Sequence, residues 1–408
     1  QLGLKNNKLI NIDEQFPAQD ILCKTGQLEQ FSSGIYAYGH IPFLVKENIK
    51  NVIRKVLTEH GCSEISLPLL QPESLWISSG RLDRYIKDKV MFRCLTEKGN
   101  YCLAPTAEEA VLEFAKSRLS SYKDLPRTYF QIGEKFRDEL RPRGFLLRGK
   151  SFEMLDAYSF GKDEKDLDDE YENMRKAYFD IFNELELSVL PVAADSGAIG
   201  GDKSEEFMVI SNIGEDNVWI SPDKKDAYNE EVLEKKNINT NGYEKVKAVE
   251  LGHIFALKDK YSKSMNGTFI NEEDKPTYYQ MGCYGIGVSR TLAMIYENSI
   301  TKDQEGNFTG LALPKKVAPY KLYIIAKDDR YEEAINFYNK LINMNIPVIF
   351  DDSKSSIGYK IKTNEVVGCP YMVLFGDKTE KGMAELENNK TKEKQMLSLD
   401  EIIKSIKW

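Results

Sequence analysis

Histidine is scarce in this sequence: the 408 residues include three, His40, His60 and His253. A histidine-based catalytic triad or a metal site with three histidine ligands is therefore poorly supported. The cysteines form no Cys-x-x-Cys pair, which argues against a structural zinc site. Residues 1–16 also lack the apolar segment of a secretory signal, so we expect reduced thiols and a cytoplasmic protein.

Long apolar runs and an excess of positive charge are also absent. No stretch of about 18 apolar residues occurs, so we expect no transmembrane helix and no membrane partner. The chain carries 56 Lys and Arg against 64 Asp and Glu, a net charge of −8, which argues against nonspecific coating of nucleic acid. The length suggests two to three domains of about 150 residues each.

Several segments of the N-terminal three quarters have a clear periodicity. Apolar residues at helical spacing predict helices over residues 44–57 and 163–187. Residues 64–70 predict a strand, which Pro68 would confine to a sheet edge or a bulge. A polar stretch at about 211–248 predicts a short surface excursion.

The last 90 or so residues alternate between strand and helix patterns. The predicted strands cover 321–326, 347–350 and 371–375, and the predicted helices cover 331–343, 360–367 and 399–406. This alternation predicts a compact α/β domain. We place its start at a proline-containing junction, so that the first domain covers residues 1–313 and the second covers residues 314–408.

Residues 127–160 hold the densest set of functional side chains. A predicted strand would direct Arg137 and Glu139 to one face. The loop after it carries Arg141, Arg143 and Arg148, and a second predicted strand places on one face Phe152, Met154, Asp156 and Tyr158. Arginine forks bind phosphate and an aromatic ring stacks a base, so the pattern suits a nucleoside triphosphate. The plainer alternative is an exposed hairpin with solvated charges.

The same segment resembles a known family. Phe136-Arg-Asp-Glu139, followed by Arg148, Phe152 and Asp156, is similar to motif 2 of class II aminoacyl-tRNA synthetases, in the wording of the bacterial type of prolyl-tRNA synthetase. Other segments match that family in the same order: QPESLWISSGR (71–81), APTAEE (104–109), ADSGAIGG (194–201), VELGHIF (249–255), MGCYGIGVSR (281–290) and APYKLYII (318–325). The resemblance implies an α+β fold, with an antiparallel-sheet catalytic domain followed by a small α/β anticodon-binding domain.

The resemblance implies an ATP site made of Arg137, Glu139, Arg148, Phe152, Glu250 and Arg290. Arg137 would hold the α-phosphate and the substrate carboxylate, and Arg148 would reach the γ-phosphate. Phe152 would stack on adenine, and Glu139 would contact the adenine side. The three arginines Arg137, Arg148 and Arg290 would be the catalytic residues, and Glu250 would be the carboxylate that binds ATP-bound Mg²⁺.

The resemblance also implies a proline site made of Thr106, Glu108, Arg137, Met154, Tyr158, His253 and Cys283. Glu108 would neutralise the cationic imino group, and the Thr106 hydroxyl would help to orient it. Plainer readings exist for several of them. Thr106 and Glu109 fit a helix capping box, Met154 and Cys283 fit ordinary core packing, and a lone His253 fits a structural histidine.

The implied function is a prolyl-tRNA synthetase that uses ATP and Mg²⁺ to join L-proline to tRNA(Pro), with Arg141 and Arg143 at the tRNA acceptor end. The family resemblance implies a homodimer through motif 1. Residues 202–248 are too few for the editing domain of the long bacterial form, so we predict no editing in cis and a free-standing trans-editing protein as a partner. Two alternatives stay open: a paralogue that activates proline for another acceptor, prompted by the altered segment 351–360, and a non-catalytic tRNA-binding regulator.

Overall fold

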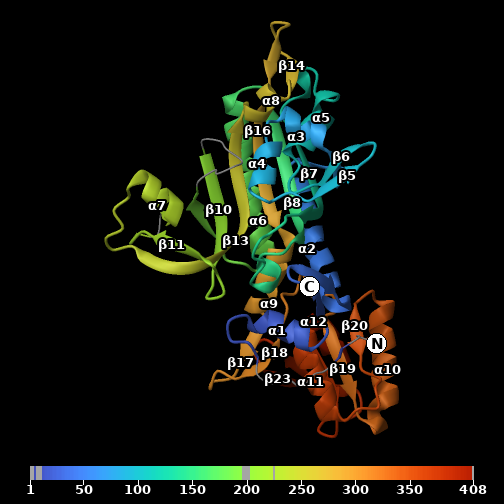
Figure 1. Ribbon diagram of the computed structural model, residues 1–408. Helices are drawn as coiled ribbons and strands as arrows, with labels where there is room; N and C mark the ends of the chain where they lie inside the picture. The colour runs from blue at the N-terminus through green and yellow to red at the C-terminus, as the bar shows by residue number, and fades with distance from the viewer. Residues whose placement is uncertain (1–3, 6–11, 195–202, 224–225, 407–408) are drawn as a thin grey trace. The chain divides into compact units, whose positions relative to one another are not determined.

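The chain folds into two compact units in the computed structural model. The structure describes residues 4–5, 12–194, 203–223 and 226–406 (Figure 1). Within these ranges, the larger unit contains residues 32–35 and 50–291, and the smaller unit contains residues 1–31, 36–49 and 292–408. The described helices are all too short or too polar to cross a membrane.

A nine-stranded sheet forms the framework of the larger unit (Figure 1). Its strands, in order across the sheet, are β10 (Lys203–Ile210), β9 (Leu190–Ala193), β12 (Ala227–Asn229), β11 (Asp216–Ile220), β13 (Glu244–Lys258), β16 (Gln280–Gly287), β8 (Ser151–Gly161), β7 (Arg127–Phe136) and β3 (Ser63–Glu64). The central pairs β13–β16, β16–β8 and β8–β7 are all antiparallel. The antiparallel sheet expected from the resemblance is therefore present.

Helix α6 (Glu164–Glu184) packs along one face of this sheet, against β8, β13 and β16 (Figure 1). The predicted helix over 163–187 is confirmed, and the side chain of Asp163 caps it by accepting a hydrogen bond from the backbone N–H of Asp166. Its apolar stripe, which includes Tyr171 and Tyr178, is fully buried.

Strands β7 and β8 form the hairpin that the sequence predicts, with Arg127 opposite Phe160 at one end and Phe136 opposite Ser151 at the other. The predicted alternation over 152–158 is confirmed, because all four even-numbered side chains line one pocket. The strand assignment of Arg137 and Glu139 is wrong. Strand β7 ends at Phe136: the N–H of Arg137 still donates to the carbonyl of Lys150, but the N–H of Asp138 donates to the carbonyl of Val90.

Shorter elements complete the larger unit. A three-stranded sheet consists of β4 (Leu70–Pro72), β6 (Gly99–Leu103) and β5 (Arg93–Thr96), and a hairpin consists of β14 (Thr268–Ile270) and β15 (Pro276–Tyr278). The helices are α3 (Glu73–Ser78), α4 (Leu82–Lys87), α5 (Glu108–Lys116), α7 (Glu230–Lys236) and α8 (Lys260–Ser264), with 3-10 turns at Tyr122–Asp124 and Phe145–Leu147. Helix α5 packs into an apolar core that also contains Tyr158, Phe160 and Cys283 of the main sheet.

Three expectations need correction, and one is confirmed. The predicted strand over 64–70 is wrong for most of its length: only Glu64, in β3, and Leu70, in β4, lie in strands, and Pro68 lies between them. The stretch 211–248 contains β11, β12 and α7, so much of it belongs to the main sheet and is not a surface excursion. The glycine-rich segment 281–290 predicts a helix that follows it, over residues 291–296, but helix α9 (Val288–Asn298) begins before Arg290. Helix α2 (His40–Glu59) confirms the predicted helix over 44–57.

A five-stranded sheet with helices forms the C-terminal part of the smaller unit. The sheet order is β20 (Val348–Phe350), β19 (Leu322–Ala326), β21 (Tyr371–Phe375), β22 (Met383–Asn388) and β23 (Lys394–Ser398), and the helices are α10 (Tyr331–Asn343), α11 (Ile357–Val367) and α12 (Leu399–Ile406). The predicted alternation is confirmed, but the sequence pattern did not predict β22 and β23. The remaining elements are α1 (Pro17–Lys24), β1 (Leu28–Ser32), β2 (Ile35–Tyr38), β17 (Ile300–Lys302), β18 (Phe308–Leu311) and a 3-10 turn at Asp328–Arg330.

Candidate active site

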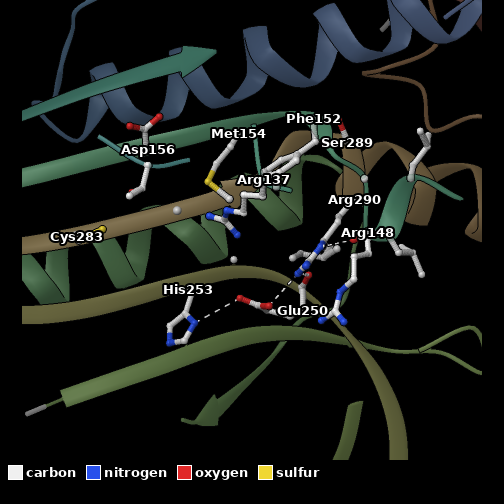
Figure 2. A pocket seen from close by; sticks show the side chains of 18 of the residues that line it. Arg137, Arg148, Phe152, Met154, Asp156, Glu250, His253, Cys283, Ser289 and Arg290 are labelled. Carbon is white, nitrogen blue, oxygen red and sulfur yellow. Dashed lines mark hydrogen bonds and ion pairs between the residues drawn. The ribbon is translucent and has the colours of Figure 1, made fainter. Parts of the chain in front are cut away.

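One pocket of the larger unit gathers the side chains predicted to bind ATP and proline (Figure 2). Its lining includes Thr106, Glu108, Arg137, Glu139, Arg148, Phe152, Met154, Tyr158, Glu250, His253, Cys283 and Arg290. They come from β8, β13, β16, the start of α5, the start of α9 and the loop between β7 and β8. The two arginines predicted at the tRNA acceptor end, Arg141 and Arg143, are exposed and lie outside this lining.

The pocket has two chemically different ends (Figure 2). We call the end that contains Arg148, Arg290 and Glu250 the arginine end. We call the end that contains Glu108, Asp156, Tyr158 and Cys283 the carboxylate end. Arg137 lies between them in the close view.

At the arginine end, Arg290 is held by several hydrogen bonds. Its Nη1 lies 2.8 Å from Oε2 of Glu250, and its Nε donates to the carbonyl of Leu147 at 2.7 Å. Burial would raise the pKa of Glu250, but the hydrogen bond from His253 and the charge of Arg290 outweigh it and hold that pKa far below its usual range. Glu250 is therefore a fixed anion beside a fixed cation.

Glu206, Glu250 and His253 form a cluster beside Arg290. Their ligand atoms all lie within 4.8 Å of one another. Burial and then the charges of Glu250 and Asp216 raise the pKa of Glu206 to about 8. Two facing carboxylates repel each other unless a cation or a proton is shared between them, and oxygen donors are what Mg²⁺ prefers. The pair Glu206 and Glu250 therefore suits a magnesium ion.

His253 makes more contacts with this cluster than with the carboxylate end. Its Nε2 lies 2.6 Å from Oγ of Ser204, and its ring stacks on Phe255 with centroids 3.8 Å apart. Its Nδ1 lies 3.4 Å from Oε1 of Glu250. Although His253 lines the pocket, these contacts also support the plainer reading of a histidine with a structural role.

Between the two ends, the guanidinium of Arg137 lies 5.2 Å from the centroid of the Phe152 ring. Its Nε donates to the carbonyl of Pro105 at 3.2 Å, which ties it to the loop before α5. Both residues are only half-buried. A cation and an aromatic face are thus available together at the centre of the pocket.

At the carboxylate end, Glu108 is fully buried and receives several hydrogen bonds. Oγ1 of Thr106 donates to its Oε2 at 2.7 Å, and Sγ of Cys283 lies 3.4 Å from its Oε1. The hydroxyl of Tyr158 donates to Asp156 at 3.1 Å and accepts from the backbone N–H of Ala107 at 3.1 Å. Tyr158 and Cys283 thus belong both to the pocket wall and to the apolar core.

The alternative capping box of Thr106 and Glu109 is not formed. The N-cap of α5 is Ala107, and no side chain caps it. Thr106 donates to Glu108 instead, and Glu109 is buried with Ser79 and Arg81. A tertiary ion pair replaces the local cap, because a buried carboxylate needs a counter-charge more than a helix end needs a cap.

Four residues near the pocket have no role in the sequence-based prediction: Arg81, Lys135, Asp156 and Glu206. The predicted strand face of Asp156 is confirmed, and its carboxylate lies 2.6 Å from Nζ of the fully buried Lys135. Glu206 and Arg81 also had no predicted role. Alternation along β7 could have directed attention to Lys135, whereas Glu206 and Arg81 meet their partners only through the fold.

Taken together, the geometry offers phosphate-binding cations at one end, a small carboxylate-lined cavity at the other, and a shared arginine between them. Such a pocket can hold an anionic nucleotide next to a small cationic ligand. Of the motif ADSGAIGG, residues 195–201 lie outside the described residues.

Comparison with known families agrees with this arrangement. The tRNA synthetase class II core domain (G, H, P, S and T) matches residues 92–299, and the anticodon binding domain matches residues 321–407. These matches confirm the expected fold class.

Among curated proteins, the chain is 35% identical over 411 residues to a proline–tRNA ligase of Rickettsia bellii, which covers 95% of this chain and 93% of the relative. It is also 35% identical over 408 residues to a proline–tRNA ligase of Sulfurimonas denitrificans, covering 93% of this chain and 92% of the relative.

Solved structures share the fold at lower identity. A prolyl-tRNA synthetase of Cryptosporidium parvum, complexed with L-proline and AMP, superposes with a TM-score of 0.75 at 18% identity, covering 99% of this chain and 77% of the other. One from Giardia lamblia, in complex with prolyl-adenylate, superposes with a TM-score of 0.75 at 19% identity, covering 94% of this chain and 74% of the other. The chain therefore belongs to the prolyl-tRNA synthetase family of class II aminoacyl-tRNA synthetases.

Proposed function

We propose that this chain activates L-proline with ATP and transfers the prolyl group to the 3′ end of tRNA(Pro). The observation that carries the proposal is the single pocket in which a phosphate-binding arginine end and a buried carboxylate end meet at Arg137. Membership in the family supports proline as the amino acid.

In the first step, a carboxylate oxygen of proline attacks the α-phosphorus of ATP, the bond to the β-phosphate oxygen breaks, and pyrophosphate leaves. Arg137 neutralises the charge shared by the proline carboxylate and the α-phosphate. Arg148 and Arg290 bind the leaving phosphates, and Phe152 stacks on adenine. Catalysis is thus positioning plus electrostatic stabilisation, with no covalent link to the protein.

Glu250, together with Glu206, would hold Mg²⁺ against the phosphates. The ion would supply positive charge to the phosphate oxygens of ATP. Glu139 is assigned to the adenine side of the site.

The carboxylate end selects the amino acid. Glu108 pairs with the secondary ammonium of proline, and Thr106 fixes the orientation of that carboxylate. Met154, Tyr158 and Cys283 form the apolar wall around the pyrrolidine ring, next to His253.

In the second step, a ribose hydroxyl at the 3′ end of tRNA attacks the acyl carbon of the adenylate, and AMP leaves. We assign Arg141 and Arg143 to the acceptor end of tRNA. We assign residues 1–313 to the catalytic domain and residues 314–408 to the anticodon-binding domain. The bounds of the two family matches support this division, whereas the compact units of the structure group residues 1–31, 36–49 and 292–313 with the second domain.

We also propose that the chain does not edit in cis and that a free-standing editing protein hydrolyses mischarged alanyl-tRNA. Residues 203–210 and 216–220 belong to strands of the main sheet, which leaves little chain for a separate editing domain. Purified chain given alanyl-tRNA(Pro) should leave it intact, whereas measurable hydrolysis would contradict this part of the proposal. The family also supports a homodimer and a cytoplasmic location. Light scattering of the purified protein would test the homodimer.

The decisive experiment is ATP–pyrophosphate exchange with each of the twenty amino acids, followed by tRNA charging in the same reaction. Proline-dependent exchange followed by charging of tRNA(Pro) is the expected result. Exchange without charging would favour a paralogue with a different acceptor, and no exchange with any amino acid would overturn the proposal.

A further inference from the structure

Arg81 is a buried cation directly behind the carboxylate end of the pocket. It precedes α4 and is only 5% exposed, and it is not among the described residues that line the pocket. Its Nη1 lies 3.0 Å from Oε2 of Glu108, and 3.1 and 3.3 Å from the two carboxylate oxygens of Glu109. One nitrogen therefore serves two carboxylates at the start of α5.

Aromatic rings surround the rest of this guanidinium. Its central carbon lies 5.1 Å from the ring of Trp76, 4.6 Å from that of Tyr85 and 5.2 Å from that of Tyr261. Its Nη2 also donates to the hydroxyl of Tyr85. These contacts match the planar, delocalised charge of arginine, and a lysine ammonium could not reproduce them.

The shared cation separates the protonation behaviour of the two carboxyl groups. Burial would raise the pKa of Glu108, but the charge of Arg81 and the hydrogen bond from Thr106 lower it overall. Burial and the charge of Glu108 both raise the pKa of Glu109. Together they outweigh the charge of Arg81, which lowers it. Of the two carboxyl groups, Glu108 therefore has the stronger preference for the anionic form, and it is the one that lines the pocket.

Other titratable groups face this pair from every neighbouring element. They are Cys102 on β6, Cys283 on β16, Tyr158 and Asp156 on β8, Tyr85 on α4, Tyr261 and Lys260 on α8, and Arg137 beyond β7. Burial raises the pKa of the Cys283 thiol and of the Tyr158 hydroxyl, so both are neutral near pH 7. Arg81 is the cation in hydrogen-bond contact with Glu108 among the described residues.

We infer that Arg81 is a positioning residue for amino acid recognition: it fixes Glu108 as the anion that receives the imino group, without touching the substrate. This inference rests on the proposed function. It predicts that loss of Arg81 weakens proline binding while ATP binding at the other end is retained.

The test compares Arg81→Gln with wild type by ATP–pyrophosphate exchange at varied proline and varied ATP, between pH 6 and 8.5. Arg81→Gln should raise KM for proline by about 10- to 100-fold, because two buried carboxyl groups lose their counter-ion, and change KM for ATP by less than about twofold. Arg84→Gln is the matched control. Arg84 lies on α4 but is exposed and pairs with Asp88, so its removal should change neither KM.

The pH profile separates this role from a merely structural one. Without Arg81 the pKa of Glu108 rises toward neutrality, so in Arg81→Gln the KM for proline should fall as pH rises, as the carboxylate form returns. In wild type this dependence should be absent. Adding Glu109→Gln to Arg81→Gln removes the competing carboxyl group and should recover at least about threefold of the lost affinity.

Each outcome decides for or against this role. Unchanged KM for proline in Arg81→Gln, or equal increases in KM for proline and for ATP, would overturn the inference, as would a pH profile like that of wild type. If near-ultraviolet circular dichroism shows that Arg81→Gln does not fold, Arg81→Lys replaces it: a raised KM for proline alone supports the role, and an unchanged one overturns it. Wild-type protein without proline-dependent exchange would instead refute the proposed function on which the inference rests.

Discussion

The two ends of the pocket place their charges in opposite order. At the carboxylate end, Glu108 and Asp156 line the cavity, and their cations, Arg81 and Lys135, lie behind them in the protein. At the arginine end, the cations themselves line the cavity, and Arg290 keeps Glu250 beside it. The charged groups that reach the lining of each end, rather than the local sum of charges, thus set which substrate group that end receives.

The comparison also explains why Arg137 is central. The two ends receive substrate groups of opposite charge, but the reaction joins a carboxylate to a phosphate, and these anions repel each other. A cation between the two ends is needed where they meet. The half-buried guanidinium of Arg137, tied to the carbonyl of Pro105, occupies that place.

The largest effect is therefore expected from Arg137→Ala. It should reduce kcat/KM for proline-dependent exchange by about 1,000-fold, because the developing charge at the junction of the two substrates loses its stabilising group. Steady-state ATP–pyrophosphate exchange measures this. Arg127→Ala is the control, since Arg127 is exposed at the far end of β7. Equal losses in both variants would show that the junction has no special role.

Glu108→Gln should act at one end only. We expect an increase of about 100-fold in KM for proline, because the imino cation loses a charge-assisted partner and Arg81 loses its pocket-side anion. KM for ATP should stay near the wild-type value. Kinetics at saturating ATP and then at saturating proline separate the two constants, and a parallel increase in both would contradict the independence of the two ends.

Glu250→Gln is the matching change at the arginine end. It should raise the Mg²⁺ concentration needed for half-maximal exchange by about tenfold, since an oxygen ligand loses its charge. Removal of Mg²⁺ with a chelator should abolish exchange in wild type. A Mg²⁺ titration measures the shift, and Glu244→Gln, at the exposed start of β13, is the control. An unchanged Mg²⁺ requirement would place the ion elsewhere.

Local sequence patterns predict some parts of the pocket and of the fold, for a physical reason. The alternation of β8 is local, so the shared face of Phe152, Met154 and Tyr158 follows from the period of a strand. The strand–helix alternation of the C-terminal sheet follows for the same reason, although the alternating apolar pattern of β22 is too short to have been recognised. In both regions, neighbours in the sequence determine the structure.

The buried counter-ions could not be predicted in this way. Arg81 and Glu108 are 27 residues apart, and only the packing of α3 against α4 and α5 brings them together. The capping box expected for Thr106 and Glu109 is wrong because this distant cation outcompetes a local hydrogen bond. Glu206 meets Glu250 through the pairing of β10 with β13, with a register shift after Phe207 that periodicity does not reveal.

The smallest effect is expected outside both ends. Arg141 is exposed and lies beyond the pocket lining, so Arg141→Ala should leave ATP–pyrophosphate exchange unchanged. It should raise KM for tRNA by about threefold, with a weaker dependence on salt, because one phosphate contact is lost. Arg143 differs from Arg141 because its Nε lies 2.6 Å from Oε1 of Glu215, which already neutralises part of its charge. Arg143→Ala should therefore raise KM for tRNA less than Arg141→Ala does. Charging assays at varied tRNA and salt give both constants. If either variant slowed proline activation, the loop between β7 and β8 would have to act in the adenylation step. This result would contradict the assignment of adenylation to the pocket and of tRNA binding to that loop.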